Sequence, residues 1–106
     1  MEIDREITLN ALIDTGTQLT ILESSCLQGW APLPIVGPGQ FAGASAQFSA
    51  DILLAEIEIP ALHIREVTRI VVVDDLSGRR ALLGRTQLRN CVLVYDGPKG
   101  NVQLRK

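Results

Sequence analysis

Three consecutive residues, Asp14, Thr15 and Gly16, are of types that could carry hydrolytic chemistry. They follow an aliphatic run at 11–13, which predicts a strand ending in a tight turn, with the aspartate on the floor of a cleft. The hydroxyl of Thr15 can hydrogen-bond backbone groups and hold that turn rigid. Because three-residue matches are common by chance, an ordinary strand-ending turn is the alternative for this motif taken alone.

A single carboxyl group cannot readily hydrolyse a peptide bond, because the attacking water needs a base and the departing amine needs an acid. Two carboxyl groups about 3 Å apart supply both, since they share one proton and titrate as a unit. The chain has one Asp-Thr-Gly, and we interpret its acidic doublet at 74–75 as a solvated turn. A catalytic pair therefore requires Asp14 from a second copy in a two-fold dimer, and a lone chain should be inactive.

A second motif, Ala-Leu-Leu-Gly-Arg at 81–85, directly precedes a helix-compatible segment at 86–91. With both motifs in this order, the chain resembles the retropepsin-like aspartic proteases. In that family a strand ends in Asp-Thr/Ser-Gly, and about 60–70 residues later an aliphatic-Gly-Arg motif opens the single C-terminal helix. Asp14 and Gly84 are 70 positions apart, and the likeness covers essentially the whole chain.

The resemblance implies a role for each motif. Asp14 would be catalytic, Thr15 would lock the two copies of the loop together across the dimer axis, and Gly16 would permit close approach of the substrate backbone. The supporting loop packed beneath the active site would consist of Leu82, Leu83, Gly84 and Arg85.

Two features depart from the retroviral pattern. Gln18 and Leu19 stand where those enzymes have an acidic pair that binds the arginine of the second motif, so Arg85 must find another partner. Thr17 stands where many of them have alanine. Its hydroxyl could donate to the outer oxygen of Asp14 and favour the ionised carboxylate, which predicts an acidic pH optimum. The alternative is that Thr17 only caps the turn.

A glycine-containing segment at 36–44 lies where the family has its flap, a β-hairpin that closes over the substrate. Glycines allow the backbone to move, as a lid requires. The spacing does not fit a dinucleotide-binding loop, and Pro38 predicts an irregular hairpin. A mobile loop without lid function is the alternative. The candidate substrate-binding residues of this segment are Gly37, Gly39, Gln40, Phe41 and Gly43.

The elements that must position these motifs are mostly strands. Period-2 alternation and β-branched runs indicate strands, and the segment at 96–100 is typical of a hairpin turn. Helix is expected only at 86–91, with a short turn around 23–28. We therefore expect one domain, residues 1–106, that is mainly β. The resemblance makes it a closed or partly closed barrel of the retropepsin type with one short C-terminal helix. The strands expected lie at 3–13, 19–22, 53–59, 70–73, 92–95 and 102–104.

The composition argues against several other classes of protein. Ten basic and twelve acidic residues give a net charge of -2, which does not favour nucleic acid as a partner. No apolar run is long enough for a membrane-spanning helix, and the first residues do not resemble a signal peptide, so the compartment stays open. His63 is the only histidine, and no CxxC pair occurs, so no metal or other cofactor is expected. Cys26 and Cys91 are interpreted as buried thiols, with a disulfide as the alternative.

The sequence thus predicts an aspartic endopeptidase that acts as a homodimer on a peptide or protein substrate. The substrate would bind extended between floor and flaps, in subsites that we expect to be apolar. The dimer interface is expected either in the C-terminal hairpin or as a weak pairing. One alternative is a non-proteolytic module of the same fold that dimerises or binds peptides. A more distant one is a β sandwich in which the two motifs are coincidental.

Overall fold

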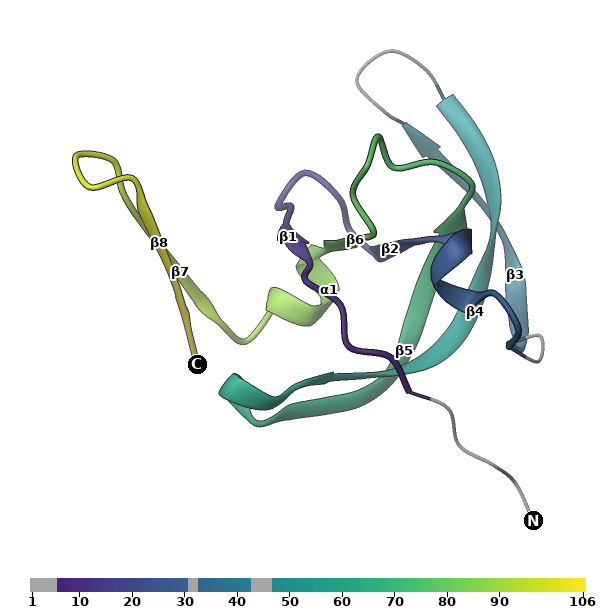
Figure 1. The fold of residues 1–106 in the computed structure, drawn as a ribbon, viewed down its shortest axis with the longest axis horizontal. Helices are drawn as coiled ribbons and strands as arrows, with labels where there is room; N and C mark the ends of the chain where they lie inside the picture. Colours follow the sequence, from purple (N-terminus) through teal and green to yellow (C-terminus); the bar gives the residue numbers. More distant parts are fainter. Residues whose placement is uncertain (1–5, 31–32, 43–46) are drawn as a thin grey trace.

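The computed structural model describes residues 6–30, 33–42 and 47–106 (Figure 1). These residues form β-strands with little helix, as the sequence predicts. The strands are β1 (Leu12–Ile13), β2 (Thr20–Glu23), β3 (Ile35–Ala42), β4 (Gln47–Ile59), β5 (Ile64–Val73), β6 (Ala81–Leu83), β7 (Val92–Asp96) and β8 (Asn101–Arg105). The helical segments are α1 (Arg85–Leu88) and the 3-10 turns η1 (Ser24–Leu27) and η2 (Pro60–Leu62).

Six strands form one sheet in the order β1-β6-β2-β5-β4-β3. The short strand β6 lies between β1 and β2, parallel to the first and antiparallel to the second. Because β1 and β2 are consecutive along the chain, the loop that joins them must cross the end of β6. That loop carries the Asp-Thr-Gly motif, so this topology brings the two sequence motifs together.

The core lies at the centre of this sheet. Ile70 and Val71 of β5, which is paired on both edges by β2 and β4, have 0% exposed surface. Successive side chains of a strand point to opposite faces, so both faces of the sheet are covered at this point. The β-branched run at 70–73 is typical of such a central strand. The other buried apolar residues are Ile21, Cys26, Ala81 and Leu83.

The N-terminal strand is much shorter than expected. The alternation at 3–13 predicts a long strand, but among the described residues only Leu12 and Ile13 pair, and 6–11 form no strand. The reason is the length of the partner: β6 has three residues, so β1 has no ladder to extend along. Residues 1–5 lie outside the described residues.

The helical predictions agree more closely with the structure. Helix α1 begins one residue before the expected segment 86–91 and ends at Leu88, where a turn closed by Cys91 N–H donating to Leu88 O follows. The 3-10 turn η1 falls within the predicted short turn at 23–28. Among the described residues, no helix has the length and apolar character needed to cross a membrane.

The six-stranded sheet is open in the described residues. Strands β1 and β3 are its two edges, and no pairing joins them. The mainly β class with one short helix is therefore confirmed, whereas the described strands do not close into a barrel within one chain.

The C-terminal strands form a separate sheet. β7 and β8 pair antiparallel from Val92 with Arg105 to Asp96 with Asn101, which confirms the predicted hairpin. Figure 1 shows this hairpin projecting away from the six-stranded sheet, beyond α1. Its apolar side chains are consequently exposed, most of all Tyr95, which is 72% exposed.

Candidate active site

Asp14 immediately follows β1 and begins a tight turn. Its backbone N–H donates to Leu83 O of β6 at 3.0 Å, and its carboxylate Oδ1 accepts a hydrogen bond from Gly16 N–H at 2.9 Å. Asp14 as a residue is half-buried. A Cβ on residue 16 would lie 3.1 Å from that same oxygen, so glycine allows the backbone amide to reach the carboxylate. The turn thus orients the carboxyl group that the sequence singles out.

The second motif packs against the backbone of this loop. Gly84 directly follows β6 and packs against the loop backbone: a Cβ there would lie 2.5 Å from the carbonyl carbon and oxygen of Leu19. The first amides of α1 continue the contact, with Arg85 N–H donating to Thr17 O and Thr86 N–H donating to Gln18 O, both at 2.9 Å. Helices leave their first N–H groups free, and here loop carbonyls accept from them.

Arg85 finds its partner within the chain. Its guanidinium Nη1 donates to the backbone carbonyl of Thr15 at 2.7 Å. The side chain is exposed and therefore braces the loop from the solvent side. This partner could not be predicted from the sequence, because every residue carries a backbone carbonyl and the residue types do not indicate which one Arg85 binds. Thr15 itself is exposed at the tip of the turn.

Thr17 does not act as the sequence suggested. Its hydroxyl donates to Leu19 O at 3.0 Å, and a hydroxyl has only one hydrogen to donate. In this structure the hydroxyl is therefore committed to the turn, which corresponds to the turn-capping alternative. The expected donation to Asp14 is absent here.

A buried polar chain underlies the site, and sequence analysis missed it. Gly84 N–H donates to Thr20 Oγ1 at 3.1 Å, and the Thr20 hydroxyl donates to Gln87 Oε1. Gln87 Nε2 in turn donates to Thr68 Oγ1 at 3.0 Å. Gln87 is only 2% exposed, and its amide fits between the two hydroxyl groups. The one indication of this chain in the sequence was a glutamine, Gln87, inside the short predicted helix.

The polar chain reaches the surface at Glu66. Gln87 Nε2 also donates to Glu66 Oε1 at 3.2 Å, and Arg89 forms an ion pair with Glu66 at 2.6 Å. The hydrogen bond from Arg89 holds the pKa of the Glu66 carboxyl below its usual range, and the partial burial of the carboxyl opposes this. Arg89 thereby fastens the end of α1 to β5.

Of the supporting residues, Leu83 is buried and Leu82 is half-buried beside β1 and β2.

The segment expected to be the flap is a hairpin in its backbone: β3 pairs with β4 from Gly37 with Ile52 to Ala42 with Gln47. Gly39, Gln40 and Phe41 lie within β3, and Gly43 lies outside the described residues. No hydrogen bond joins the described part of this hairpin to the Asp14 loop.

The irregularity of this hairpin is real but lies earlier than Pro38. The register shifts between Ile35 and Gly37, whereas Pro38 stays in register with Asp51. An edge strand such as β3 tolerates proline better than a central strand, because every second backbone nitrogen faces away from the partner strand.

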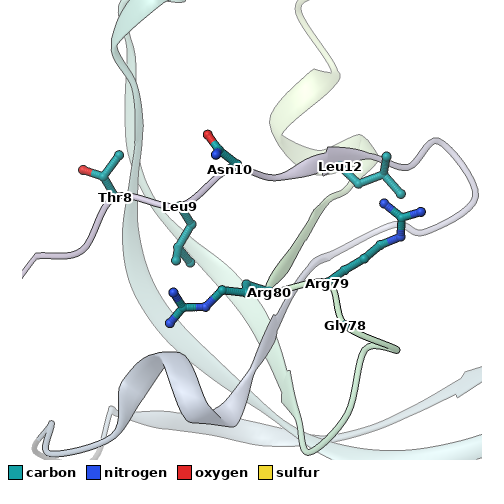
Figure 2. A pocket seen from close by; sticks show the side chains of 7 residues that line it. All are labelled: Thr8, Leu9, Asn10, Leu12, Gly78, Arg79 and Arg80. Carbon is teal, nitrogen blue, oxygen red and sulfur yellow. The ribbon is translucent and has the colours of Figure 1, made fainter.

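An open hollow of about 360 Å³ lies beside β1 (Figure 2). One wall is the segment from Thr8 to Leu12, and the other is the turn that precedes β6. That turn carries a basic doublet, Arg79-Arg80, to which the sequence alone gave no role. The hollow is lined by Thr8, Leu9, Asn10, Leu12, Gly78, Arg79 and Arg80.

Both cysteines are free thiols in this structure. Cys26 is buried, as expected, and Cys91 is half-buried. In the part of the chain that the structure describes, no three His, Cys, Asp or Glu side chains gather as a metal site would need.

No protein-family model, curated protein or solved structure matches this chain. Its function is therefore inferred from its own motifs and geometry.

Proposed function

We propose that this chain is an aspartic endopeptidase of the retropepsin-like type that acts as a homodimer, with Asp14 of each copy activating the attacking water. One observation carries the proposal: the Asp14 loop crosses the end of β6 in contact with Gly84, and the Gly16 amide holds its carboxylate. Two motifs 70 residues apart are thereby joined in one site, with α1 starting directly after Gly84.

By its one Asp-Thr-Gly motif, each chain contributes one candidate carboxyl group, that of Asp14. The acidic doublet at 74–75 is exposed, whereas Asp14 is half-buried and follows the strand that pairs with β6. Ser77 N–H donates to Asp75 Oδ1 at 2.7 Å. Ser24 Oγ donates to Asp74 Oδ1 at 3.4 Å. A second copy of Asp14 is therefore the natural source of the other half of the pair.

The chemistry follows from placing two such carboxyl groups together. At about 3 Å apart they cannot both ionise, so one accepts a proton from water while the other donates one to the carbonyl oxygen or the leaving amine. The Asp14 loop is braced by backbone hydrogen bonds on both sides, so the carboxyl group is held ready before the substrate arrives.

The C-terminal hairpin supports a homodimer. A lone two-stranded hairpin is marginally stable in water, and this one exposes apolar side chains on both faces. Val92 and Val94 lie on one face of β7, and Leu93 and Tyr95 lie on the other. Association with a second hairpin would cover these side chains and pair an open strand edge.

The substrate would lie extended across the Asp14 loop, with the β3–β4 hairpin as the flap over it. Gly37, Gly39, Gln40, Phe41 and Gly43 remain its proposed substrate-binding residues, and no metal or organic cofactor enters this proposal.

The test is proteolysis of a denatured protein between about pH 3 and about pH 7. Wild-type chain should cut it and should be inhibited by pepstatin. Asp14→Asn should be inactive, whereas Glu58→Gln, which makes the same carboxyl-to-amide change at an exposed position of β4, should remain active. Full activity of Asp14→Asn would exclude the mechanism.

A dilution series separates the two function classes. If the active unit is a dimer, activity per chain falls as the chain is diluted and the sedimentation mass falls with it. A stable dimer that cuts nothing over the whole pH range would instead identify a non-proteolytic dimerisation or peptide-binding module of this fold.

A further inference from the structure

The hollow beside β1 combines two features that point to a ligand. Its wall from Thr8 to Leu12 ends two residues before Asp14 in the chain. Its other wall carries two arginines, Arg79 and Arg80. Figure 2 shows Arg79 extending toward Leu12 and Arg80 extending toward Leu9, at opposite ends of the hollow.

These two arginines have no partner among the described residues. The ion pairs found there join Arg65 with Glu56 and Arg89 with Glu66. In the same part of the chain, neither the Arg79 nor the Arg80 guanidinium group makes a hydrogen bond; the Cys26 thiol contacts only the backbone carbonyl of Arg80. The nearest acidic residues in the sequence, at 74–75, accept hydrogen bonds from Ser24 and Ser77 instead.

The backbone that carries these arginines is nevertheless anchored. Arg80 O accepts from Glu23 N–H at 3.0 Å, and Arg79 N–H donates to Leu76 O at 3.2 Å. The two positively charged side chains therefore extend from a turn whose backbone is fixed by hydrogen bonds, and they lie beside the apolar side chains of Leu9 and Leu12. A glutamate side chain fits this combination, because its methylenes can contact the leucines while its carboxylate accepts from guanidinium groups.

We propose that this hollow is a substrate subsite that binds a glutamate side chain of the peptide through the guanidinium group of Arg79 at the Leu12 end, while Arg80 adds positive charge at the other end. The inference rests on the proposed peptidase function and adds a charged subsite to the apolar ones expected from the sequence.

The experiment uses peptides of about ten residues that share one cleavable bond, first mapped by mass spectrometry of a digested denatured protein. Each position in turn carries either Glu or its uncharged counterpart Gln. Assays at about pH 6 keep the glutamate ionised. At one position on one side of the bond, the kcat/KM of the wild-type chain should be roughly threefold to fivefold higher for the Glu peptide than for the Gln peptide.

Arg79→Gln and Arg80→Gln should each reduce this preference, and raising the salt from about 0.05 M to about 0.5 M should do the same. Arg69→Gln is the matched control, because Arg69 is exposed on β5, outside the hollow. Equal cleavage of Glu and Gln peptides at every position, or a preference untouched by both arginine variants, would overturn the subsite.

A binding assay keeps the subsite testable if nothing is cut. Fluorescence anisotropy with the Asp14→Asn chain and the same labelled peptides measures affinity without chemistry. Tighter binding of the Glu peptide that weakens in Arg79→Gln would support the subsite even if the peptidase proposal fails. Equal affinity for both peptides would overturn the subsite and leave the peptidase proposal standing if wild-type chain cuts them.

Discussion

Gly84 and Leu19 touch through their backbones at the point where the Asp14 loop crosses β6. A single added carbon on Gly84 would stand 2.5 Å from the Leu19 carbonyl, well inside van der Waals contact. The residues are 65 positions apart in the chain. The contact joins the loop of the first motif to the beginning of α1, so the geometry of the candidate site depends on it.

Gly84→Ala should therefore destabilise the fold. The φ of Gly84 is −89°, which any residue adopts, so the cost is steric and should be about 1–3 kcal/mol of unfolding free energy. Urea unfolding followed by circular dichroism measures it. Gly37→Ala is the control, because a Cβ there meets nothing within 4 Å. Equal midpoints for both variants would show that the loop does not rest on Gly84.

Gln87→Ala should destabilise the fold by about 1–3 kcal/mol, because the buried hydroxyls of Thr20 and Thr68 lose the amide that pairs them. Gln28→Ala, at an exposed position, is the control and should change stability little.

The same chain predicts a split between two substitutions of Thr20. Thr20→Val keeps the shape and leaves Gly84 N–H without an acceptor, so it should destabilise clearly. Thr20→Ser keeps the hydroxyl and should retain more of the stability. Indistinguishable melting curves for the two variants would argue against the hydrogen-bonded chain.

The Glu66–Arg89 pair should make stability depend on pH in one direction. Arg89 lowers the pKa of folded Glu66, so the pair stabilises the fold above the pKa of an unfolded glutamate, about 4.3. That contribution is lost as the pH falls through the lower folded value. Glu66→Gln should thus lower the urea midpoint at about pH 6 and lower it less at about pH 3.

Glu56→Gln is the comparison for this pH series. Glu56 pairs with Arg65 at 2.7 Å, but the side chains are 49% and 69% exposed, against 22% and 52% for Glu66 and Arg89. A more exposed pair contributes less, so its loss should move the midpoint at about pH 6 by a smaller amount. A larger effect for Glu56→Gln would contradict this ranking.

Tyr95→Lys should weaken the proposed dimer, because it places a charge on the most exposed apolar side chain of the C-terminal hairpin. Sedimentation velocity should show a shift from two chains toward one, with a parallel loss of activity per chain. Val67→Lys changes an apolar residue of similar exposure on β5 and should leave the mass unchanged. A dimer that survives Tyr95→Lys but not Val67→Lys would place the interface on β5.

Much of the local structure could be predicted from residue types. Asp14 and Gly16 form the expected turn because the hydrogen bond that closes it spans only two residues. The alternation at 53–59 predicted part of β4, and the segment at 96–100 predicted the turn between β7 and β8, for the same reason. Strand periodicity and hairpin turns are short-range properties. The predicted strand at 3–13 failed because its length depends on a partner that lies about 70 residues away.

The residue types thus specified which segments are strands, where the turns fall and which carboxyl group is the candidate for chemistry. Tertiary structure alone placed β6 between β1 and β2, gave Arg85 the carbonyl of Thr15 and linked Thr20 to Gln87. Such contacts form between segments distant in the chain, and several of them end on backbone atoms. Every residue carries the same backbone groups, so these partners are set by how the chain packs and not by the order of its side chains.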